Sequence, residues 1–301
     1  MFSLDYFAAG LEAFAGKFSS LSQGILSQEL NFKTLTLFAL IFFSSFYLFS
    51  TVRFCVRLML MQLCITITAI LSIPLCIICA ITGYRGKSHH LTGRFYSFLS
   101  QLMFNHRYYI LDDEVLRDLK NTPVIYIGNH QSSLDISSLG AIFPDNCSVM
   151  AKKSLQYVPL VGLYLWLSST FFIDRNNHAK AIATTSALAK NMQEKKLSVF
   201  IYPEGTRSGL EEPTLLPFKK GAFHLALETG FPIVPIVFSN TNNLFCFKHC
   251  RFESGGMGIK VLKPICTQGK TKENIQELID EAQTAMADCL KEISAIDYNK
   301  L

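Results

Sequence analysis

The sequence predicts an α/β fold: a mixed, largely parallel sheet flanked by helices and preceded by an N-terminal hydrophobic helical hairpin. From about residue 95, short apolar runs rich in β-branched residues alternate with helical stretches, the pattern of strand–helix–strand units. Before that point, residues 34–52 and 58–83 form two uncharged apolar runs. Each is close to the roughly 20 residues that a helix needs to cross a bilayer.

The 301 residues divide into three predicted parts, 1–30, 31–94 and 95–301. In the first part, apolar residues recur every three or four positions from Phe7 to Ile25, which gives a helix one apolar face. We expect this amphipathic segment to lie on a membrane surface. The alternative is a helix that packs on the α/β domain.

The connector between the two apolar runs is too short to be a domain, so residues 31–94 are expected to form a helical hairpin. The hairpin either spans the bilayer or dips into one leaflet. Lys33 precedes the first run, and Arg85 and Lys87 follow the second, against two arginines in the connector. The preference of basic flanks for the cytosolic side therefore favours both ends in the cytosol. Nine scattered cysteines, an odd number, fit reduced thiols in that compartment.

Six strands and four helices are expected in the third part. Ligands of such sheets gather at the carboxyl ends of the strands, so polar residues that directly follow a strand are the candidate site. The predicted strands are residues 124–128, 148–151, 171–174, 198–202, 233–238 and 259–262. The predicted helices are residues 134–143, 179–195, 221–228 and 272–296.

The formal net charge of +5 is mild and is compatible with an anionic ligand. We find no basic helix with base-reading periodicity, no zinc-finger spacing and no long Lys/Arg block, so nucleic acid is not an expected partner. Cys246, His249 and Cys250 are candidate metal ligands, but no second pair matches them. No metal is therefore expected.

A first polar cluster follows the predicted strand 124–128 and contains His130 and Asp135. On a regular helix, five residues leave two side chains about 140° apart, so the two would not face each other there. If the strand ends at His130 and Ser132 or Ser133 caps the next helix, Asp135 lies in the first turn and can fold back to the imidazole. Such a pair is a general base for a hydroxyl. The alternative is a helix cap with an incidental histidine.

Candidate phosphate ligands follow two other strands. Gly205 allows a tight turn after the strand 198–202, and Arg207 presents a planar fork of donors that suits a phosphate. Arg175 follows the strand 171–174 and is a second candidate. The alternatives are a surface turn with a solvated arginine, and an Asp–Arg pair on the surface.

Two pairs of lysines are further candidates for binding an anionic ligand. Lys219 and Lys220 stand at a predicted helix start, where cations are unfavourable unless an anion lies nearby. Lys152 and Lys153 follow a predicted strand. The alternative for each pair is a solvated basic face.

Four motifs occur in order along the chain: His-x₄-Asp at 130–135, Phe-Ile-Asp-Arg at 172–175, Pro-Glu-Gly-Thr-Arg at 203–207 and Ile-Val-Pro-Ile-Val at 233–237. With them the sequence resembles the glycerolipid acyltransferase family, specifically the 1-acylglycerol-3-phosphate acyltransferases of eukaryotic and fungal type. The resemblance covers roughly residues 60–295. One departure is Tyr202, where many relatives carry Phe.

The resemblance implies an enzyme that transfers a fatty acyl group from acyl-CoA to the sn-2 hydroxyl of lysophosphatidic acid and gives phosphatidic acid. Acyl-CoA is its co-substrate, and no cofactor is implied. His130 would be the base and Asp135 would orient it. The implied substrate-binding residues, with Lys219 and Lys220 open to the phosphate of either substrate, are Arg175, Glu204, Gly205, Thr206, Arg207, Lys219 and Lys220.

Other functions are weighed against this one. Within the family, a glycerol-3-phosphate or another lysophospholipid acyltransferase remains open. A serine lipase needs a Gly-x-Ser-x-Gly elbow, and no such pentapeptide occurs. A non-catalytic membrane scaffold would not need these polar clusters together. The expected location is the endoplasmic reticulum membrane, with the α/β domain in the cytosol and the lipid bilayer as a partner.

Overall fold

The computed structural model describes residues 32–301 except 113, 120–121 and 175–177. The chain divides into two compact units, Met1–Arg53 and Phe54–Leu301. In the first unit, helix α2 (Phe32–Leu48) is strongly apolar. The expected amphipathic segment 1–30 lies outside the described residues, and the three-part division stays a prediction.

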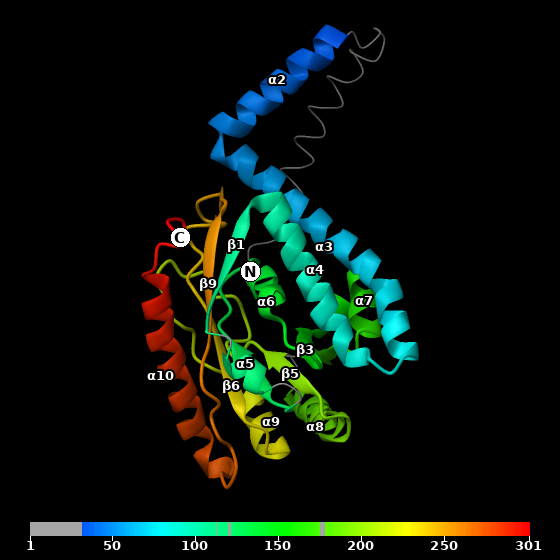
Figure 1. Cartoon of the computed structure of the whole chain (residues 1–301), viewed down its shortest axis with the longest axis vertical. Helices are drawn as coiled ribbons and strands as arrows, with labels where there is room; N and C mark the ends of the chain where they lie inside the picture. Colours follow the sequence, from blue (N-terminus) through cyan, green and yellow to red (C-terminus); the bar gives the residue numbers. More distant parts are fainter. Residues whose placement is uncertain (1–31, 113, 120–121, 175–177) are drawn as a thin grey trace. The chain divides into compact units, whose positions relative to one another are not determined.

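A seven-stranded sheet forms the centre of the second unit (Figure 1). Its strand order is β1-β9-β6-β2-β5-β3-β4. Within this sheet only β6 and β9 pair antiparallel, so β1 and β9 run opposite to the other five strands. The strands are β1 His106–Asp112, β2 Ile125–Gly128, β3 Cys147–Lys152, β4 Phe171–Ile173, β5 Ser198–Ile201, β6 Ile233–Phe238 and β9 Gly255–Val261, with a separate pair of β7 Phe245–Cys246 and β8 Arg251–Phe252.

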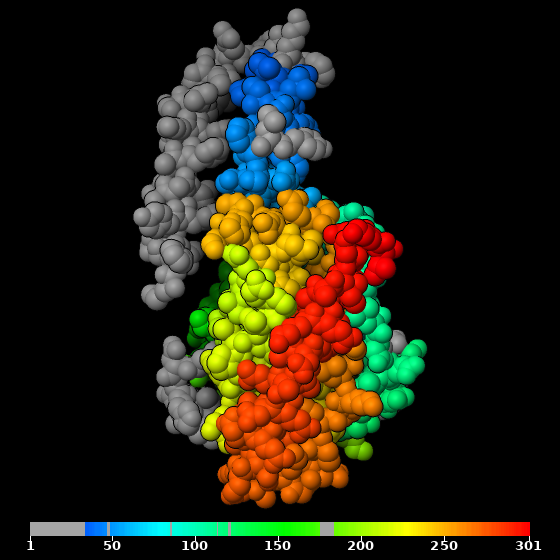
Figure 2. All heavy atoms as spheres, turned by 90° about the vertical axis from the view of Figure 1, so that its left-hand side faces the viewer, coloured from blue at the N-terminus to red at the C-terminus, as the bar shows by residue number. Residues whose placement is uncertain are grey.

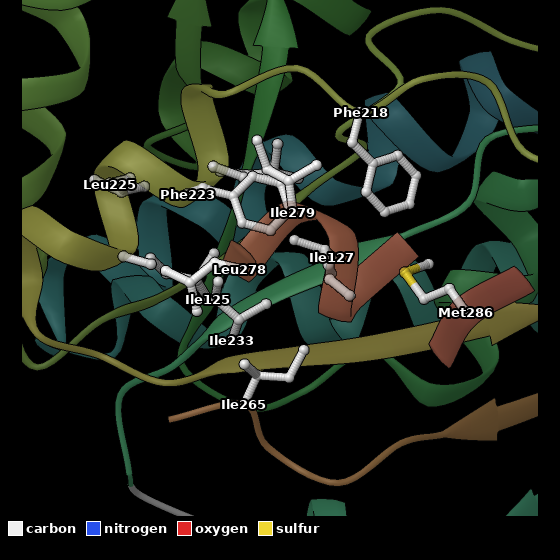
Figure 3. Close-up of a cluster of buried hydrophobic side chains, with 14 of the residues drawn as sticks. Ile125, Ile127, Phe218, Phe223, Leu225, Ile233, Ile265, Leu278, Ile279 and Met286 are labelled. Carbon is white, nitrogen blue, oxygen red and sulfur yellow. The ribbon is translucent and has the colours of Figure 1, made fainter. Parts of the chain in front are cut away.

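Helices cover both faces of this sheet because the central strands are apolar on both sides, as expected for buried parallel strands. On one face, α8, α9 and α10 pack on side chains that include Ile125, Val199 and Ile233 (Figure 3). On the other face, α6 packs on Tyr126 and Phe200. These helices are α5 Glu114–Asp118, α6 Asp135–Ile142, α7 Val161–Leu167, α8 His178–Lys195, α9 Gly221–Thr229 and α10 Ile275–Ser294. Short 3₁₀ turns precede α4 (η1 Arg85–Lys87), α7 (η2 Lys153–Tyr157) and α10 (η3 Lys272–Asn274).

Helix α10 is amphipathic and closes one side of the core. Leu278, Ile279 and Ala282 share its buried face with residues one and two turns further along. Its polar face lies on the surface, where Figure 2 shows the helix crossing the molecule in orange and red. The helix therefore covers one face of the sheet.

Two helices, α3 (Ser50–Ile81) and α4 (Ser88–Phe104), are long and largely apolar. They share a buried cluster that includes Phe54 and Tyr96. By length and composition, α3 is the one helix in the described part of the chain that could cross a membrane. Large apolar side chains are exposed along this region: Met59, Leu63, Ile70, Leu71, Ile77, Ile78 and Ile81 on α3, and Leu91, Phe98, Leu102 and Met103 on α4.

The predicted fold class is confirmed: the sheet is mixed and mostly parallel, helices flank it and apolar helices precede it. All six predicted strands and all four predicted helices are present. The elements that were not predicted are β1, α4, α5, α7, the β7–β8 pair and the 3₁₀ turns η1 and η2. The predicted part boundary at residue 94 falls inside α4.

Candidate active site

A cavity of about 1790 Å³ opens where β2, β3 and β5 end. One end of it lies between α3, α4 and α7 and is mostly apolar. The other end lies beside α8, α9 and η3 and is polar. His130, Tyr202 and Arg207 also line the cavity. The location agrees with the general rule that ligands of α/β sheets bind at the carboxyl ends of strands.

His130 and Asp135 are in direct contact inside this cavity. The Nδ1 atom of His130 lies 2.7 Å from Oδ2 of Asp135. The same oxygen accepts backbone N–H bonds from Gln131 at 2.6 Å and Ser132 at 3.0 Å. Because an ionised carboxylate can only accept, Nδ1 carries the proton and Nε2 is the nitrogen with a free lone pair. The Asp135 side chain is 1% exposed and that of His130 is 17% exposed, so the pair is rigidly held yet reachable from the cavity.

The expected fold-back of Asp135 is present, but the expected capping by serine is wrong. Helix α6 begins at Asp135, and its N-cap, Leu134, makes no side-chain cap bond. Instead, Ser132 Oγ accepts the N–H of Leu134 at 3.1 Å and lies 3.2 Å from Thr241 Oγ1. The carboxylate of Asp135 bonds to the loop's backbone N–H groups, so it satisfies donors that a capping serine would otherwise take.

Tyr202 supports the imidazole from one side. Its ring stacks on that of His130 with centroids 4.0 Å apart and an interplanar angle of 16°. Burial, reinforced by the charge of Asp135, raises the pKa of the Tyr202 phenol well above its usual value. The hydroxyl is buried and has no hydrogen-bond partner among the described residues. Tyr202 therefore stays neutral, and its ring limits rotation of the base.

Glu204 joins the two loops through backbone N–H groups. Its Oε1 accepts the N–H of His130 at 2.6 Å, and its Oε2 accepts that of Leu216 at 2.9 Å. The contact follows from strand register, because Ile127 of β2 pairs with Ile201 of β5. His130 lies three residues after Ile127, and Glu204 lies three residues after Ile201. Glu204 is 2% exposed, and burial raises the pKa of its carboxyl although the N–H donors oppose the shift.

The turn after Glu204 is fixed by the same loop. Ser208 N donates to the carbonyl of His130 at 2.8 Å, and Gly209 N donates to that of Gln131 at 3.1 Å. Gly205 has φ +69°, which favours glycine. A Cβ atom at this position would also lie 2.8 Å from Nζ of Lys219, so the Lys219 ammonium lies against the turn. Base and turn thus form one hydrogen-bonded unit.

The structure places most of the predicted ligands around the cavity. Its lining includes Gly205, Thr206, Arg207, Lys219 and Lys220. Thr206 and Arg207 are solvent-exposed, as residues that meet a soluble headgroup must be.

The remaining predicted residues are placed differently. Arg175 lies outside the described residues. Lys152 lines the cavity, whereas Lys153 pairs with Asp174 at 3.5 Å. Glu204 points both carboxylate oxygens at backbone donors, so a direct contact with substrate stays a prediction.

Sequence reasoning missed the residues that anchor the His130 loop to the sheet. Asn129 exchanges two hydrogen bonds with the backbone of Phe238, at 2.9 and 2.8 Å. The amide nitrogen of Gln131 donates to the carbonyls of Phe238 and Ser239 at 2.9 and 3.0 Å. A signal was present, since both amides directly follow a fully apolar strand, where a polar side chain needs a partner.

Comparisons with known proteins agree with this geometry. A family model described as Acyltransferase matches residues 105–239. The 1-acyl-sn-glycerol-3-phosphate acyltransferase of Saccharomyces cerevisiae is 43% identical over 72% of this chain and 71% of its own length. The human 1-acyl-sn-glycerol-3-phosphate acyltransferase beta is 33% identical over 77% of this chain and 81% of its own. The crystal structure of the 1-acyl-sn-glycerophosphate (LPA) acyltransferase PlsC from Thermotoga maritima shares the fold, with a TM-score of 0.63 and 21% identity over 81% of this chain and 98% of that one.

Proposed function

Because the chain belongs to the acyltransferase family, among the 1-acyl-sn-glycerol-3-phosphate acyltransferases, we propose that it uses acyl-CoA as donor and lysophosphatidic acid as acceptor. The product is phosphatidic acid. The observation that carries the proposal is the 2.7 Å contact between His130 and Asp135, in a cavity that Arg207 also lines.

The chemistry follows from the orientation of His130. Nε2 accepts the proton of the sn-2 hydroxyl as its oxygen attacks the thioester carbonyl carbon. The carbon–sulfur bond then breaks and releases CoA thiolate, which takes up a proton and leaves the histidine neutral. A thiolate is a good leaving group, because thiol pKa values near 8.5 lie far below those of alcohols. The buried carboxylate of Asp135 stabilises the imidazolium that forms in between, and a positioned base of this kind contributes about 10²–10⁴ in rate.

Arg207 and Lys219 bind the phosphate of the acceptor. Both line the cavity, and the ammonium of Lys219 lies against Gly205 in the same turn. Thr206 and Arg175 share the contact as predicted from the sequence. Each charge-assisted hydrogen bond is worth about 1.5–3 kcal/mol before discounting for solvent exposure. The hydrogen bonds between this turn and His130 keep the phosphate and the base in a fixed relation.

The apolar end of the cavity takes the fatty acyl chain. Ile65 and Ala69 of α3 and Leu165 of α7 contribute to its walls. Large apolar side chains are exposed on α3 and α4, and so are Tyr157 at the end of η2 and Trp166 on α7. Together they make a surface that favours lipid over water. We assign this surface to a bilayer, that of the endoplasmic reticulum, with the α/β domain in the cytosol.

The test is an acyl-transfer assay on membranes that contain the whole chain. Labelled acyl-CoA is incubated with lysophosphatidic acid, glycerol 3-phosphate or another lysophospholipid, and the lipid products are identified. Phosphatidic acid should form from lysophosphatidic acid, and His130→Ala should abolish it. His249→Ala, which changes an exposed histidine outside the cavity, is the matched control and should retain full turnover. Product from glycerol 3-phosphate alone, or full turnover by His130→Ala, would overturn the proposal.

A further inference from the structure

The polar end of the cavity carries a basic cluster that the proposed reaction does not yet use. Lys220, His224 and Lys272 all line it and come from two separate elements, the start of α9 and the turn η3. We call these three residues the α9–η3 rim. Lys220 and His224 are one helical turn apart, whereas Lys272 comes from a distant part of the chain, so the fold brings it to the other two.

The two lysines of the rim are not neutralised by ion pairs. Across the described residues, no ion pair joins Lys220 or Lys272 to a carboxylate. The neighbouring Lys270 differs, because it is bound by Glu277 at 3.0 Å. Glu228 also lines this end of the cavity, and its charge acts on His224. Glu273 lies near Lys272, but neither acid forms an ion pair with a rim lysine among the described residues. The rim therefore presents net positive charge to whatever occupies the polar end.

The position of Lys220 adds to this field. It is the N-cap residue of α9 and makes no side-chain cap bond. A cation at a helix N-terminus is locally unfavourable, because the unpaired backbone N–H groups there already carry partial positive charge. An anion next to Lys220 would be bound by both. His224 lies one turn further along α9, and the charges of Lys272 and Lys220 help burial to lower the pKa of its imidazole.

The structure also separates Lys219 from Lys220. Lys219 lies against Gly205, on the side of the Arg207 turn. Lys220 lies with His224, on the side of η3. The two adjacent lysines thus lie against different parts of the cavity lining, and we assign them to two anion sites. Two sites suit a reaction in which both substrates carry phosphate.

We propose that the α9–η3 rim binds the phosphates of the nucleotide part of acyl-CoA. The inference rests on the proposed function and assigns its donor subsite. With the acyl chain in the apolar end and the thioester beside His130, the rim is a cationic part of the same cavity lining that the acyl chain leaves free. The nucleotide carries a diphosphate and a 3′-phosphate, and such a polyanion needs more cationic partners than the single phosphate at Arg207 and Lys219.

The experiment combines kinetics with direct binding on the full chain. The double variant Lys220→Ala/Lys272→Ala and the single charge reversal Lys272→Glu are compared with wild type. The KM for acyl-CoA should rise about tenfold or more in the double variant, as expected for two lost contacts that are partly screened by solvent. The KM for lysophosphatidic acid should change less than about twofold. Lys291→Ala removes an exposed lysine of α10 outside the cavity and should change neither constant.

Two further ligands test the contact between the rim and the nucleotide phosphates directly. Acyl-dephospho-CoA, which lacks the 3′-phosphate, should have a raised KM with wild type and a smaller penalty with the double variant. Adenosine 3′,5′-bisphosphate should bind wild type in calorimetry and bind the double variant about tenfold more weakly. An unchanged KM for acyl-CoA, or a selective rise in the KM for lysophosphatidic acid, would overturn the assignment. Binding of the bisphosphate without any acyl transfer would overturn the proposed function and retain the subsite, so the two failures are distinct.

Discussion

Glu204 offers the sharpest test of how the site is built, because its geometry favours positioning over substrate contact. Its two oxygens accept one backbone N–H each, from His130 at 2.6 Å and from Leu216 at 2.9 Å. Glu204→Gln keeps the shape but has only one acceptor oxygen, so its amide N–H₂ must face one of these N–H groups. The side chain is 2% exposed, and water cannot readily replace the lost acceptor.

The magnitude follows from that single mismatch. One buried, unsatisfied donor costs about 1–3 kcal/mol. In a unit of this size this corresponds to a fall of roughly 2–10 °C in melting temperature. If the donor is the N–H of His130, the base is displaced, and an error of about 1 Å can lower the rate about 10²-fold. We therefore expect kcat to fall about 10–100-fold with little change in the KM for lysophosphatidic acid.

The assay is steady-state acyl transfer on membranes, with the KM of each substrate measured separately and melting followed in parallel. Glu292→Gln removes an exposed carboxylate of α10 and is the matched control, with unchanged kcat. A raised KM for lysophosphatidic acid at unchanged kcat would show that Glu204 contacts the acceptor, as predicted from the sequence, and would refute the positioning role.

The stability effect also has a pH signature. Burial raises the pKa of Glu204 in the folded protein above its ordinary value. In the window between these two values, the folded state keeps a proton that the unfolded chain releases. The stability from this proton is full below the ordinary pKa of about 4.3 and is lost as the pH rises through the raised one. Because glutamine cannot titrate, the melting deficit of Glu204→Gln should shrink as the pH rises above the ordinary pKa of a glutamate; a constant deficit would contradict the shift.

Three further substitutions test the remaining parts of the site. Asp135→Asn removes the charge that stabilises the imidazolium, so kcat should fall about 10²–10⁴-fold with the protein still folded; near-normal kcat would remove Asp135 from the mechanism. Arg207→Ala should raise the KM for lysophosphatidic acid about 10-fold or more and leave that for acyl-CoA within about twofold; a lower kcat at unchanged KM would indicate a transition-state role. Tyr202→Phe keeps the ring that stacks on His130 and should retain kcat within about threefold, whereas Tyr202→Ala should lower it about tenfold or more; equal losses in both would assign the effect to the hydroxyl.

The fold was predictable where the sequence signal is local. Strands β2, β5 and β6 are buried on both faces and read as continuous apolar runs. Strand β1 was missed because its seven residues include His106, Arg107 and Asp112 and alternate poorly between buried and exposed. Its pairing with β9 joins residues nearly 150 positions apart, and no local pattern encodes such a partner.

The candidate site divides in the same way. The contact between His130 and Asp135 was predictable because it spans five residues and depends on one strand end and one helix start. The contacts of Glu204 were not, because its partner His130 is 74 positions away and meets it only through the parallel pairing of β2 and β5. The separation of Lys219 from Lys220 likewise depends on Gly205 and η3, which are brought to α9 by the fold.

The residues around His130 favour direct transfer of the acyl group between substrates over a covalent acyl-enzyme intermediate. A covalent intermediate needs a hydroxyl or thiol beside Nε2 of His130. Ser132, the nearest serine in the loop, turns its Oγ to Leu134 and Thr241. No cysteine lines the cavity in the described part of the chain. Neither Ser132 nor a cysteine is therefore placed to act as the nucleophile, which favours a hydroxyl supplied by the bound acceptor, whose phosphate we assign to Arg207.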